Sequence, residues 1–417
     1  MSKYIIEGGK ELRGEVTVGG AKNAALKMMA ATILTSEPCI LQNVSRISDV
    51  ETMIEVLNRL GVESHFGEDG TLTVHASGSL REEAPYDLVS QMRASIVVLG
   101  PLLARLGRAR VAMPGGCNIG SRKIDLHLRG LRSLGANINT GHGYIEAEAK
   151  NLRGTTIALD FPSVGATENI LMASVLASGR TVIENAAREP EVIDLITFLN
   201  SMGARINGAG TTVIEIEGVE ELKGTTHRVI PDRIEAGTFL IAGAVTGGEV
   251  VVKDANHDRL ELVIEKLKQA GAQVSVFPDR IALSMSRRPR ALDVSTLPYP
   301  GFPTDLQPLM ATLLSLSEGI SVVTENVFEN RFLYIDELNR MGANIYLDGH
   351  HAVIRGVESL SGAPVRVSDL RAGAALVLAG LAAKGATEVE DIFHVERGYS
   401  DFDNKLRALG ADITRAD

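Results

Sequence analysis

The sequence has no tryptophan, only two cysteines and no long hydrophobic run. Aromatic residues make up 4% of its 417 residues, which argues against base-stacking platforms for single-stranded nucleic acid. Two cysteines, Cys39 and Cys117, are too few for a disulfide framework, as is typical of a reducing compartment. The longest apolar stretch, residues 372–383, is too short to span a membrane, and the first residues contain no apolar segment of a signal peptide. We therefore expect a cytoplasmic protein that does not bind membranes.

The chain also lacks an excess of basic residues. Its 42 lysines and arginines stand against 52 aspartates and glutamates, and the net charge of −10 argues against a general nucleic-acid binder. A local cluster of positive groups could still bind an anionic small molecule. The nine histidines show no zinc-ligand spacing, and there is no Walker loop, dinucleotide fingerprint or Gly-x-Ser-x-Gly elbow. We expect neither a metal nor a cofactor.

A leucine-rich segment that ends in glycine occurs six times along the chain. The steps between successive glycines are 68 to 74 residues, so the chain is a repeat array. Apolar residues before each glycine follow a helical period, and glycine suits the left-handed C-terminal cap of a helix. The six glycines are Gly61, Gly135, Gly203, Gly271, Gly342 and Gly410.

Each repeat contains a second helix upstream, which is rich in alanine and apolar on nearly every side. Such a helix is buried in the middle of a domain. The six begin near Lys22, Arg93, Ala166, Arg233, Asp305 and Arg371. A short β-branched strand follows each of them, and two further strands follow each glycine. The pattern predicts an α/β fold.

The phrase Leu-x-Gly, which precedes a strand in several repeats, indicates how the repeats are grouped. It occurs at residues 12–14, before the first glycine segment, whereas the sixth repeat ends at residue 417 without a copy. We infer that the N-terminal strands complete the last repeat. Residues 1–20 and 231–417 would then form one domain and residues 21–230 the other, with three repeats each. An open solenoid is the alternative.

The starts of the six buried helices carry charged and polar residues. A helix N-terminus offers free N–H groups and a partial positive charge, which favour phosphates and carboxylates. If the helices of a domain run parallel, their starts form one anion-binding face. The cations at these starts are Lys22, Arg93, Arg233 and Arg371. In the alternative interpretation, Asp232, Thr304 and Asp369 are ordinary N-caps.

Residues 114–123, Pro-Gly-Gly-Cys-Asn-Ile-Gly-Ser-Arg-Lys, form the least regular segment. Three glycines permit mobility and close backbone approach. Cys117 lies five residues before Arg122, and nearby cations lower a thiol pKa and raise its reactivity. A free cysteine is more often a small buried apolar residue, and Cys39 fits that description. We expect a chemical role for Cys117 and a lid function for its loop.

The chain resembles the UDP-N-acetylglucosamine 1-carboxyvinyltransferase family of enolpyruvyl transferases over its whole length. The motifs that carry the resemblance are residues 20–24, 92–95, 114–117, 163–167, 231–235, 302–305, 329–332, 369–372 and 397–399. The resemblance implies two similar domains, each an inside-out α/β barrel of three repeats with buried parallel helices, and an active site in the interdomain cleft. It also implies transfer of the enolpyruvyl group of phosphoenolpyruvate to the 3′-hydroxyl of UDP-N-acetylglucosamine, with release of phosphate, at the start of peptidoglycan synthesis. We expect a monomer that is a target of fosfomycin.

The resemblance also implies roles for individual residues. Cys117 would be the acid that protonates the substrate methylene or assists product release, and Asp305 the base for the sugar hydroxyl. The residues that would bind phosphoenolpyruvate are Lys22, Arg122 and Arg397, with Asn23 and Arg371 close by. Those that would hold the nucleotide sugar are Arg93, Arg122, Lys123, Ile124, Asp125, Leu126, Ser163, Val164, Gly165, Asp305 and Val327. Lys123 replaces the proline that this family usually has at that position.

Two other functions stay open. A 5-enolpyruvylshikimate-3-phosphate synthase shares the fold and the donor, but its usual Lys-Ser motif is here Lys22-Asn23, and it has no counterpart of the Cys117 loop. The chain could also be a silent paralogue that binds a nucleotide sugar. A binder of that kind has no need for the acid and the base.

Overall fold

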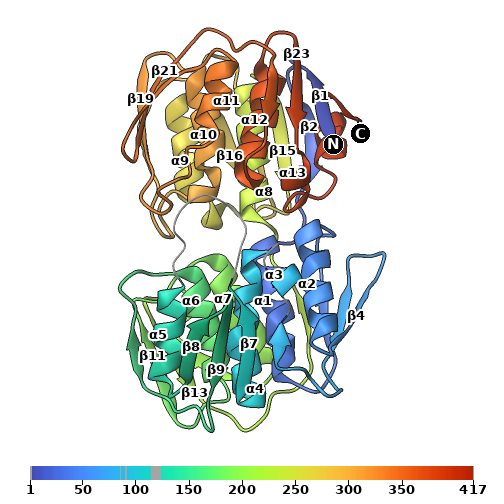
Figure 1. Ribbon diagram of the computed structural model, residues 1–417. Helices are drawn as coiled ribbons and strands as arrows, with labels where there is room; N and C mark the ends of the chain where they lie inside the picture. The colour runs from blue at the N-terminus through green and yellow to red at the C-terminus, as the bar shows by residue number, and fades with distance from the viewer. Residues whose placement is uncertain (1, 85, 90–91, 114–123, 417) are drawn as a thin grey trace. The chain divides into compact units, whose positions relative to one another are not determined.

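The computed structural model describes residues 2–84, 86–89, 92–113 and 124–416, with residue 93 described by its backbone alone (Figure 1). The chain divides into two compact units. Residues 20–113 and 124–230 form one, called here the inserted unit. Residues 2–19 and 231–416 form the other, called the terminal unit because it holds both ends of the described chain. Both units are built from α-helices and short β-strands.

The inserted unit contains the first three repeats. Repeat 1 consists of α1 (Lys22–Ala31), η1 (Thr32–Leu34), β3 (Cys39–Gln42), α2 (Ser48–Arg59), β4 (Glu63–Phe66) and β5 (Leu72–His75). Repeat 2 consists of β6 (Glu83–Ala84), α3 (Tyr86–Val89), η2 (Arg93–Val98), α4 (Leu99–Leu106), β7 (Arg108–Ala112), α5 (Asp125–Ser133), β8 (Asn137–Gly141) and β9 (Tyr144–Glu148). Repeat 3 consists of β10 (Thr156–Ala158), α6 (Val164–Ser174), β11 (Arg180–Glu184), α7 (Pro190–Ser201), β12 (Arg205–Asn207) and β13 (Val213–Glu217), and β14 (Thr226–Arg228) follows it.

The terminal unit begins with β1 (Lys3–Glu7) and β2 (Arg13–Thr17) and resumes with repeat 4. Repeat 4 consists of α8 (Arg233–Val245), β15 (Glu249–Lys253), η3 (His257–Arg259), α9 (Glu261–Ala270), β16 (Gln273–Val276) and β17 (Arg280–Ser284). Repeat 5 consists of β18 (Val294–Ser295), η4 (Thr304–Leu306), α10 (Gln307–Ser315), β19 (Ile320–Thr324), α11 (Ile335–Arg340), β20 (Asn344–Asp348) and β21 (His351–Arg355). Repeat 6 consists of β22 (Pro364–Arg366), α12 (Leu370–Ala382), β23 (Ala386–Glu390), α13 (Phe393–Glu396), α14 (Phe402–Ala408) and β24 (Asp412–Ala416).

The described strands form six four-stranded sheets, one for each repeat. In β10-β11-β13-β12, for example, β10 runs parallel to β11, and the β12–β13 hairpin completes the sheet in antiparallel pairing. The alternating burial of β11 and β13 follows from this arrangement, because one face of the sheet packs on helices. The α/β prediction with three repeats in each unit is confirmed.

Two strands are exchanged where the chain passes between the units. β2 precedes α1 in sequence but pairs with β15 of repeat 4, with Arg13 opposite Glu249. β14 precedes α8 in sequence but pairs with β3 of repeat 1, with Thr226 opposite Ile40. Each unit therefore closes its own set of three repeats, which excludes an open solenoid.

The prediction that the N-terminal strands complete the last repeat was right for one strand only. β1 lies between β23 and β24 and completes the sheet of repeat 6. β2 belongs to the sheet of repeat 4. The sequence pattern could not separate them, because pairing partners hundreds of residues away decide which sheet a short strand joins.

The alanine-rich helices form the centre of each unit and run in the same direction within it. In the terminal unit, the hydroxyl of Thr312, the sixth residue of α10, donates a 3.3 Å hydrogen bond to the carbonyl of Ala375, the sixth residue of α12. In the inserted unit, the ammonium of Lys27, the sixth residue of α1, lies 3.0 Å from the carboxylate of Glu168, the fifth residue of α6. The starts of α10 and α12 are also in contact, since Nη2 of Arg371 lies 3.1 Å from Oδ2 of Asp305, so these two helices run side by side in the same direction.

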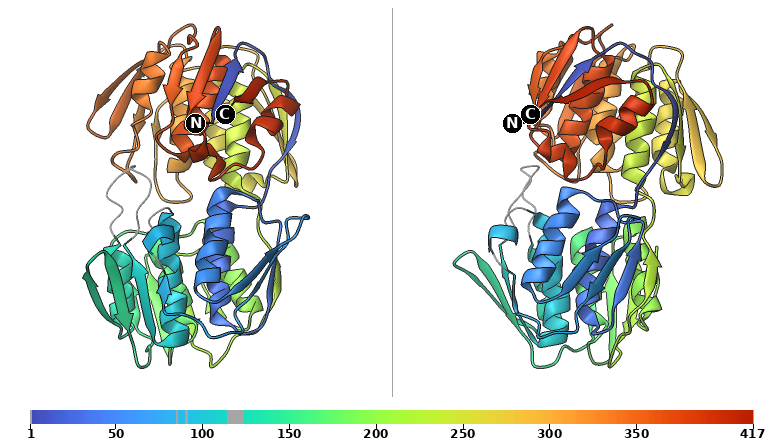
Figure 2. Two further views of the ribbon diagram at one scale, coloured as in Figure 1. Left: turned by 45° about the vertical axis from the view of Figure 1, so that its right-hand side comes forward. Right: turned by 90° about the vertical axis from the view of Figure 1, so that its right-hand side faces the viewer.

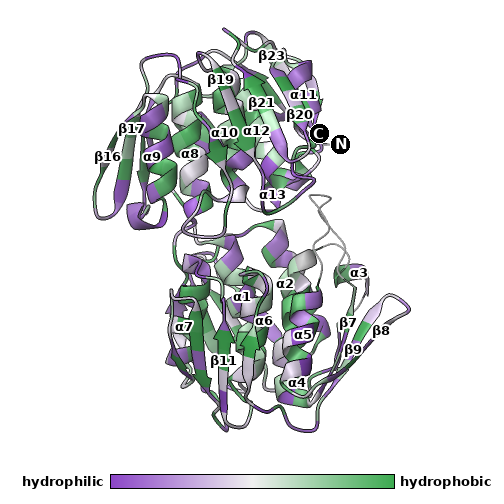
Figure 3. Ribbon diagram, turned by 90° about the vertical axis from the view of Figure 1, so that its left-hand side faces the viewer, coloured by the Kyte–Doolittle hydropathy of each residue, from purple (hydrophilic) through white to green (hydrophobic). Residues whose placement is uncertain are grey.

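These central helices are apolar nearly all round, as predicted. α8 and α12 have 12 buried residues each, and Figure 3 shows their hydrophobic colouring. In the views of Figure 2 strands lie on the outer side of each unit, and the amphipathic helices also reach its surface. Each unit has its own hydrophobic core, and within the part of the chain that the structure describes no helix is long and apolar enough to cross a bilayer.

The six glycines of the repeat have the left-handed backbone that was predicted for them. Their φ angles lie between 89° and 110°. Gly271 is the C-cap of α9, and its N–H donates to the last turn of that helix. A side chain is disfavoured at such φ values, so glycine ends each amphipathic helix sharply before the next strand.

Candidate functional site

Asp305 lies at the centre of a charged cluster at the N-terminal end of the central helices of the terminal unit. It is in η4, the short helix that leads into α10. Its Oδ1 lies 2.8 Å from Nη1 of Arg331, and its Oδ2 lies 3.1 Å from Nη2 of Arg371. Both arginine side chains are 3% exposed, whereas the carboxylate of Asp305 is 24% exposed. Two buried guanidinium groups thus fix the direction of a carboxylate that remains accessible.

Arg371 is held from several sides. Burial opposes its charge, but nearby acidic groups, Asp305 and Asp232 among them, raise its pKa above the ordinary value. Its guanidinium lies 5.3 Å from the ring centre of Tyr399, and the Tyr399 hydroxyl is 2.8 Å from the hydroxyl of Thr238 on α8. Tyr399 therefore connects α8 to α12 at the cluster.

Two buried arginine nitrogens in this cluster have no hydrogen-bond acceptor among the described residues. They are Nη1 of Arg371 and Nε of Arg331. Buried donors are rarely left unpaired, and each is costly. A carboxylate or phosphate of a ligand would satisfy them.

The alternative that the helix starts carry ordinary N-caps is right for two residues and wrong for one. Asp232 accepts hydrogen bonds from the N–H groups of Ile234 and Glu235, and Asp369 caps α12 in the same way. Thr304 caps no helix: the N-cap of η4 is Pro303, and the Thr304 hydroxyl donates a 2.9 Å hydrogen bond to Glu325. The oxygen that would accept a backbone N–H in a cap instead accepts a 3.1 Å hydrogen bond from Nη1 of Arg331.

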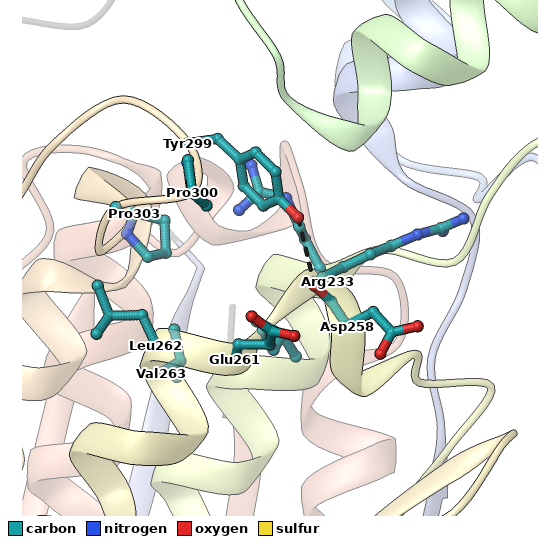
Figure 4. A pocket seen from close by; sticks show the side chains of 11 residues that line it. Arg233, Asp258, Glu261, Leu262, Val263, Tyr299, Pro300 and Pro303 are labelled. Atoms are coloured by element: carbon teal, nitrogen blue, oxygen red, sulfur yellow. Dashed lines mark hydrogen bonds between the residues drawn. The ribbon is translucent and has the colours of Figure 1, made fainter. Parts of the chain in front are cut away.

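Arg397 and Val327, two further predicted residues, also lie in the terminal unit. Arg397 is the C-cap of α13, and burial together with its charge lowers the pKa of the neighbouring His394. Val327 lies two residues after Glu325, and its N–H donates a 2.8 Å hydrogen bond to that carboxylate. The predicted Arg233 is separate from these, since its guanidinium lies 5.6 Å from the ring centre of Tyr299 in a crevice beside η3 and α9 (Figure 4).

Lys22 lies at the first turn of α1 in the inserted unit. Its Nζ is 3.0 Å from Oδ2 of Asp49, which is in the first turn of α2. The Lys22 side chain is 12% exposed and that of Asp49 is 5% exposed. Asn23 follows on α1 and is partly buried. This pairing holds a cation at the helix N-terminus, where an anion is favoured.

The predicted nucleotide-sugar segments of the inserted unit are brought together by α5 and α6. Ile124 is the N-cap residue of α5, and Asp125 and Leu126 form its first turn. Ser163 caps α6, whose first residues are Val164 and Gly165. His127 of α5 packs against Gly165 so closely that a Cβ there would lie 3.1 Å from the imidazole. The absence of a side chain at Gly165 therefore lets the two helix starts approach.

A buried ion pair that sequence analysis missed joins α1 and α6. Glu168 is fully buried, and burial raises its pKa to about 7 although the ammonium of Lys27 acts in the opposite direction. The charges of Glu191 and Glu189 raise it further. Its signal in the sequence was a charged residue near the middle of each of two largely apolar helices.

Several predicted residues lie outside the described part of the chain. They are Cys117, Arg122, Lys123 and the side chain of Arg93. Cys39 is described: it is buried at the start of β3, and burial raises the pKa of its thiol, as expected for a small apolar residue. Arg331 was part of a quoted motif, but its position beside Asp305 could be seen only in the structure.

Comparison with known proteins gives consistent results. The family model of EPSP synthase (3-phosphoshikimate 1-carboxyvinyltransferase) matches residues 6–406. UDP-N-acetylglucosamine 1-carboxyvinyltransferase 2 of Carboxydothermus hydrogenoformans is 57% identical over 417 residues, which cover 100% of this chain and 99% of the relative. UDP-N-acetylglucosamine 1-carboxyvinyltransferase of Gluconacetobacter diazotrophicus is 55% identical over 419 aligned residues, covering 100% and 99%.

Solved structures resemble the fold of the whole chain. The enolpyruvyl transferase NikO from Streptomyces tendae has a TM-score of 0.90 at 28% identity, covering 100% of this chain and 99% of that one. An EPSP synthase from Acinetobacter baumannii has a TM-score of 0.76 at 22% identity, covering 100% of both chains. The latter likeness concerns the fold alone.

Proposed function

Because the chain belongs to the UDP-N-acetylglucosamine 1-carboxyvinyltransferase family of enolpyruvyl transferases, we propose that it transfers the enolpyruvyl group of phosphoenolpyruvate to the 3′-hydroxyl of UDP-N-acetylglucosamine and releases phosphate. The observation that carries the proposal is identity above 50% over the full length to relatives of that name. The EPSP synthase structure, at 22% identity, supports the shared fold and not the shikimate acceptor.

The proposed base is Asp305. The sugar hydroxyl must lose a proton when its oxygen attacks C2 of phosphoenolpyruvate, while the methylene carbon of the donor gains one. Asp305 is suited to the first task because its carboxylate is held by Arg331 and Arg371 and remains partly exposed. Cys117 is proposed as the acid that protonates the methylene or assists product release.

Cations in both units are proposed to bind phosphoenolpyruvate. Lys22, Arg371 and Arg397 are described, and Arg122 belongs to the same proposed set. Arginine and lysine suit a substrate that carries both a phosphate and a carboxylate, since guanidinium binds such groups in bidentate geometry. The unpaired Nη1 of Arg371 supports this assignment, because an anionic oxygen would satisfy it.

The proposed contacts of the nucleotide sugar follow the first turns of α5 and α6 and the turn at Val327. They comprise Arg93, Arg122, Lys123, Ile124, Asp125, Leu126, Ser163, Val164, Gly165, Asp305 and Val327. Asn23 belongs with the residues proposed near phosphoenolpyruvate. Free N–H groups at the starts of α5 and α6 favour a diphosphate.

The proposed reaction is the first committed step of peptidoglycan synthesis, and so serves cell-wall formation, cell shape and division. We place it in the cytoplasm, with a monomeric enzyme. Alkylation of Cys117 by fosfomycin and a phosphoenolpyruvate adduct on the same thiol belong to the proposal. Mass spectrometry after incubation with each compound would show whether the added mass is on Cys117.

A phosphate-release assay with each acceptor tests the function. Turnover with UDP-N-acetylglucosamine and none with shikimate 3-phosphate is the expected result. Activity only with shikimate 3-phosphate would overturn the proposal. Tight binding of UDP-N-acetylglucosamine without turnover would favour a silent paralogue.

A further inference from the structure

Glu325 is a buried carboxylate to which the proposed reaction assigns no role. It follows β19 directly in the terminal unit and is 2% exposed. A carboxylate removed from water is destabilising unless hydrogen bonds satisfy its oxygens. The donors that satisfy Glu325 therefore show which parts of the chain it holds together.

One oxygen of Glu325 holds the turn that contains Val327. Oε1 accepts hydrogen bonds from the N–H groups of Val327 at 2.8 Å and Phe328 at 3.0 Å. It also accepts one from the hydroxyl of Thr296 at 2.8 Å, and that hydroxyl in turn accepts from the N–H of Asn326. This side of the carboxylate fixes the backbone of residues 325–328.

The other oxygen leads to Asp305. Oε2 accepts a 2.9 Å hydrogen bond from the hydroxyl of Thr304, the residue before Asp305. The same hydroxyl accepts a 3.1 Å hydrogen bond from Nη1 of Arg331, and this Nη1 is 2.8 Å from Oδ1 of Asp305. The directions are unambiguous, because a carboxylate only accepts, a guanidinium only donates, and one hydroxyl can do both.

We propose that Glu325 and Thr304 are positioning residues that orient Arg331 and thereby the proposed base Asp305. This inference rests on the proposed function, in which Asp305 takes the proton of the sugar hydroxyl. Glu325 fixes the proton of the Thr304 hydroxyl, so that an oxygen lone pair faces Arg331. Arg331, held at that angle, fixes Oδ1 of Asp305 in the direction needed for proton transfer. Loss of the relay misplaces the base and lowers kcat more than it weakens substrate binding.

The central variant is Thr304→Val, which removes the hydroxyl and keeps the size and branching of the side chain. We expect kcat to fall at least about tenfold, since a well-placed general base contributes roughly 10²–10⁴-fold. KM for both substrates should stay within about threefold, because no proposed substrate contact is removed. Thr304→Ser keeps the hydroxyl and should restore most of kcat.

Two further variants separate positioning from stability. Glu325→Gln keeps an oxygen that can accept from the 325–328 turn, but it presents an N–H to the Thr304 hydroxyl. The hydrogen bond between the two side chains then runs in the opposite direction. We expect a loss of kcat similar to that of Thr304→Val. Thr296→Val is the matched control. It removes a buried hydroxyl that donates to Oε1 of Glu325, whereas the hydroxyl of Thr304 donates to Oε2, the oxygen that leads to Asp305. It should lower the melting temperature and leave kcat within about threefold of wild type.

The four variants and wild type are assayed by phosphate release with UDP-N-acetylglucosamine and with shikimate 3-phosphate. A wild type active only with shikimate 3-phosphate would overturn the proposed function. The kcat values of the same variants with that acceptor would then show whether Thr304 and Glu325 position Asp305. Thr304→Val with wild-type kcat, or a kcat loss in Thr296→Val as large as in Thr304→Val, would overturn the relay. A wild type inactive with both acceptors would overturn both proposals.

Discussion

The two units have the same succession of helices and strands but use buried charge differently. In the terminal unit, Asp305 and Arg371 lie at the starts of helices and pair with each other, and Asp305 also pairs with Arg331 in the turn before α11. Between α10 and α12 the polar contact is a neutral hydroxyl–carbonyl hydrogen bond from Thr312. In the inserted unit, the pair Lys27–Glu168 lies between the central helices themselves. The comparison teaches that the repeat specifies the helices and their direction, whereas each unit places its charges independently.

The largest effect should come from replacing the carboxylate at the helix starts. In Asp305→Asn the amide cannot accept a proton, so we expect turnover to fall by about 10²-fold or more. Binding of UDP-N-acetylglucosamine, measured by titration calorimetry, should change far less. Asp305→Glu, which keeps the charge, controls for loss of the arginine partners. Turnover of Asp305→Asn within about threefold of wild type would show that Asp305 is not the base.

A weaker effect, on binding, is expected at the corresponding helix start of the inserted unit. Lys22→Ala removes a cation proposed to contact phosphoenolpyruvate, so the affinity for this substrate should fall roughly 30-fold, as expected for a hydrogen bond to a charged group. The affinity for the nucleotide sugar should fall much less, and Lys22→Arg should retain more affinity than Lys22→Ala. Equal losses for both substrates in a binding titration would contradict the assignment.

The pair Lys27–Glu168 predicts a dependence on pH that is specific to the inserted unit. Burial raises the pKa of Glu168 to about 7, above its value in the unfolded chain. The folded state therefore binds more protons between about pH 4.5 and 7, and the free energy of unfolding should fall as pH rises through this window. In Glu168→Gln this contribution is absent. Urea unfolding at pH 5, 6, 7 and 8 should show wild type losing on the order of 2 kcal/mol relative to Glu168→Gln.

The other titrating groups are common to both proteins, so the difference between the two curves isolates Glu168. Parallel curves across the whole range would mean that Glu168 does not titrate there. In Lys27→Met the carboxylate loses the ammonium that lowers its pKa, so the decline of stability should continue to higher pH than in wild type.

The smallest effect should be equal in the two units. Gly203 and Gly271 are equivalent glycines with φ angles of 103° and 110°, and a Cβ at either would meet no atom within 4 Å. Substitution by alanine therefore costs only the left-handed backbone, about 1–2 kcal/mol for each. Thermal unfolding should show similar destabilisation by Gly203→Ala and Gly271→Ala, with unchanged turnover. Stabilisation by either alanine would refute the capping role.

Much of the fold followed from local patterns. A glycine after an amphipathic helix predicts a left-handed cap, and all six occur. An alanine-rich helix without a polar face predicts burial, as α8 and α12 show. The sequence pattern already grouped residues 1–20 with residues 231–417. It did not show which sheets β2 and β14 join, because strands of three to five residues join a sheet through hydrogen bonds to distant partners.

The candidate site was predictable only in part. Asp305 and Arg371 were expected from motifs, and the structure brings their side chains within 3.1 Å. Thr304 was considered as a helix cap, but its hydroxyl bonds to Glu325, 21 residues away. As a cap, the hydroxyl oxygen would accept from a nearby backbone N–H, but in the structure it accepts from Arg331, 27 residues away. The sequence alone does not show that Glu325 and Arg331 lie close enough to form these bonds.

The sequence by itself determined the number of repeats, the ends of their helices and the apolar character of the central ones, because each depends on residues within one or two turns. Only the tertiary structure decided which strand completes which sheet, which carboxylates are buried, and which donors satisfy them. Those choices depend on desolvation and on distances between side chains far apart in the chain. Neither quantity exists until the units have folded.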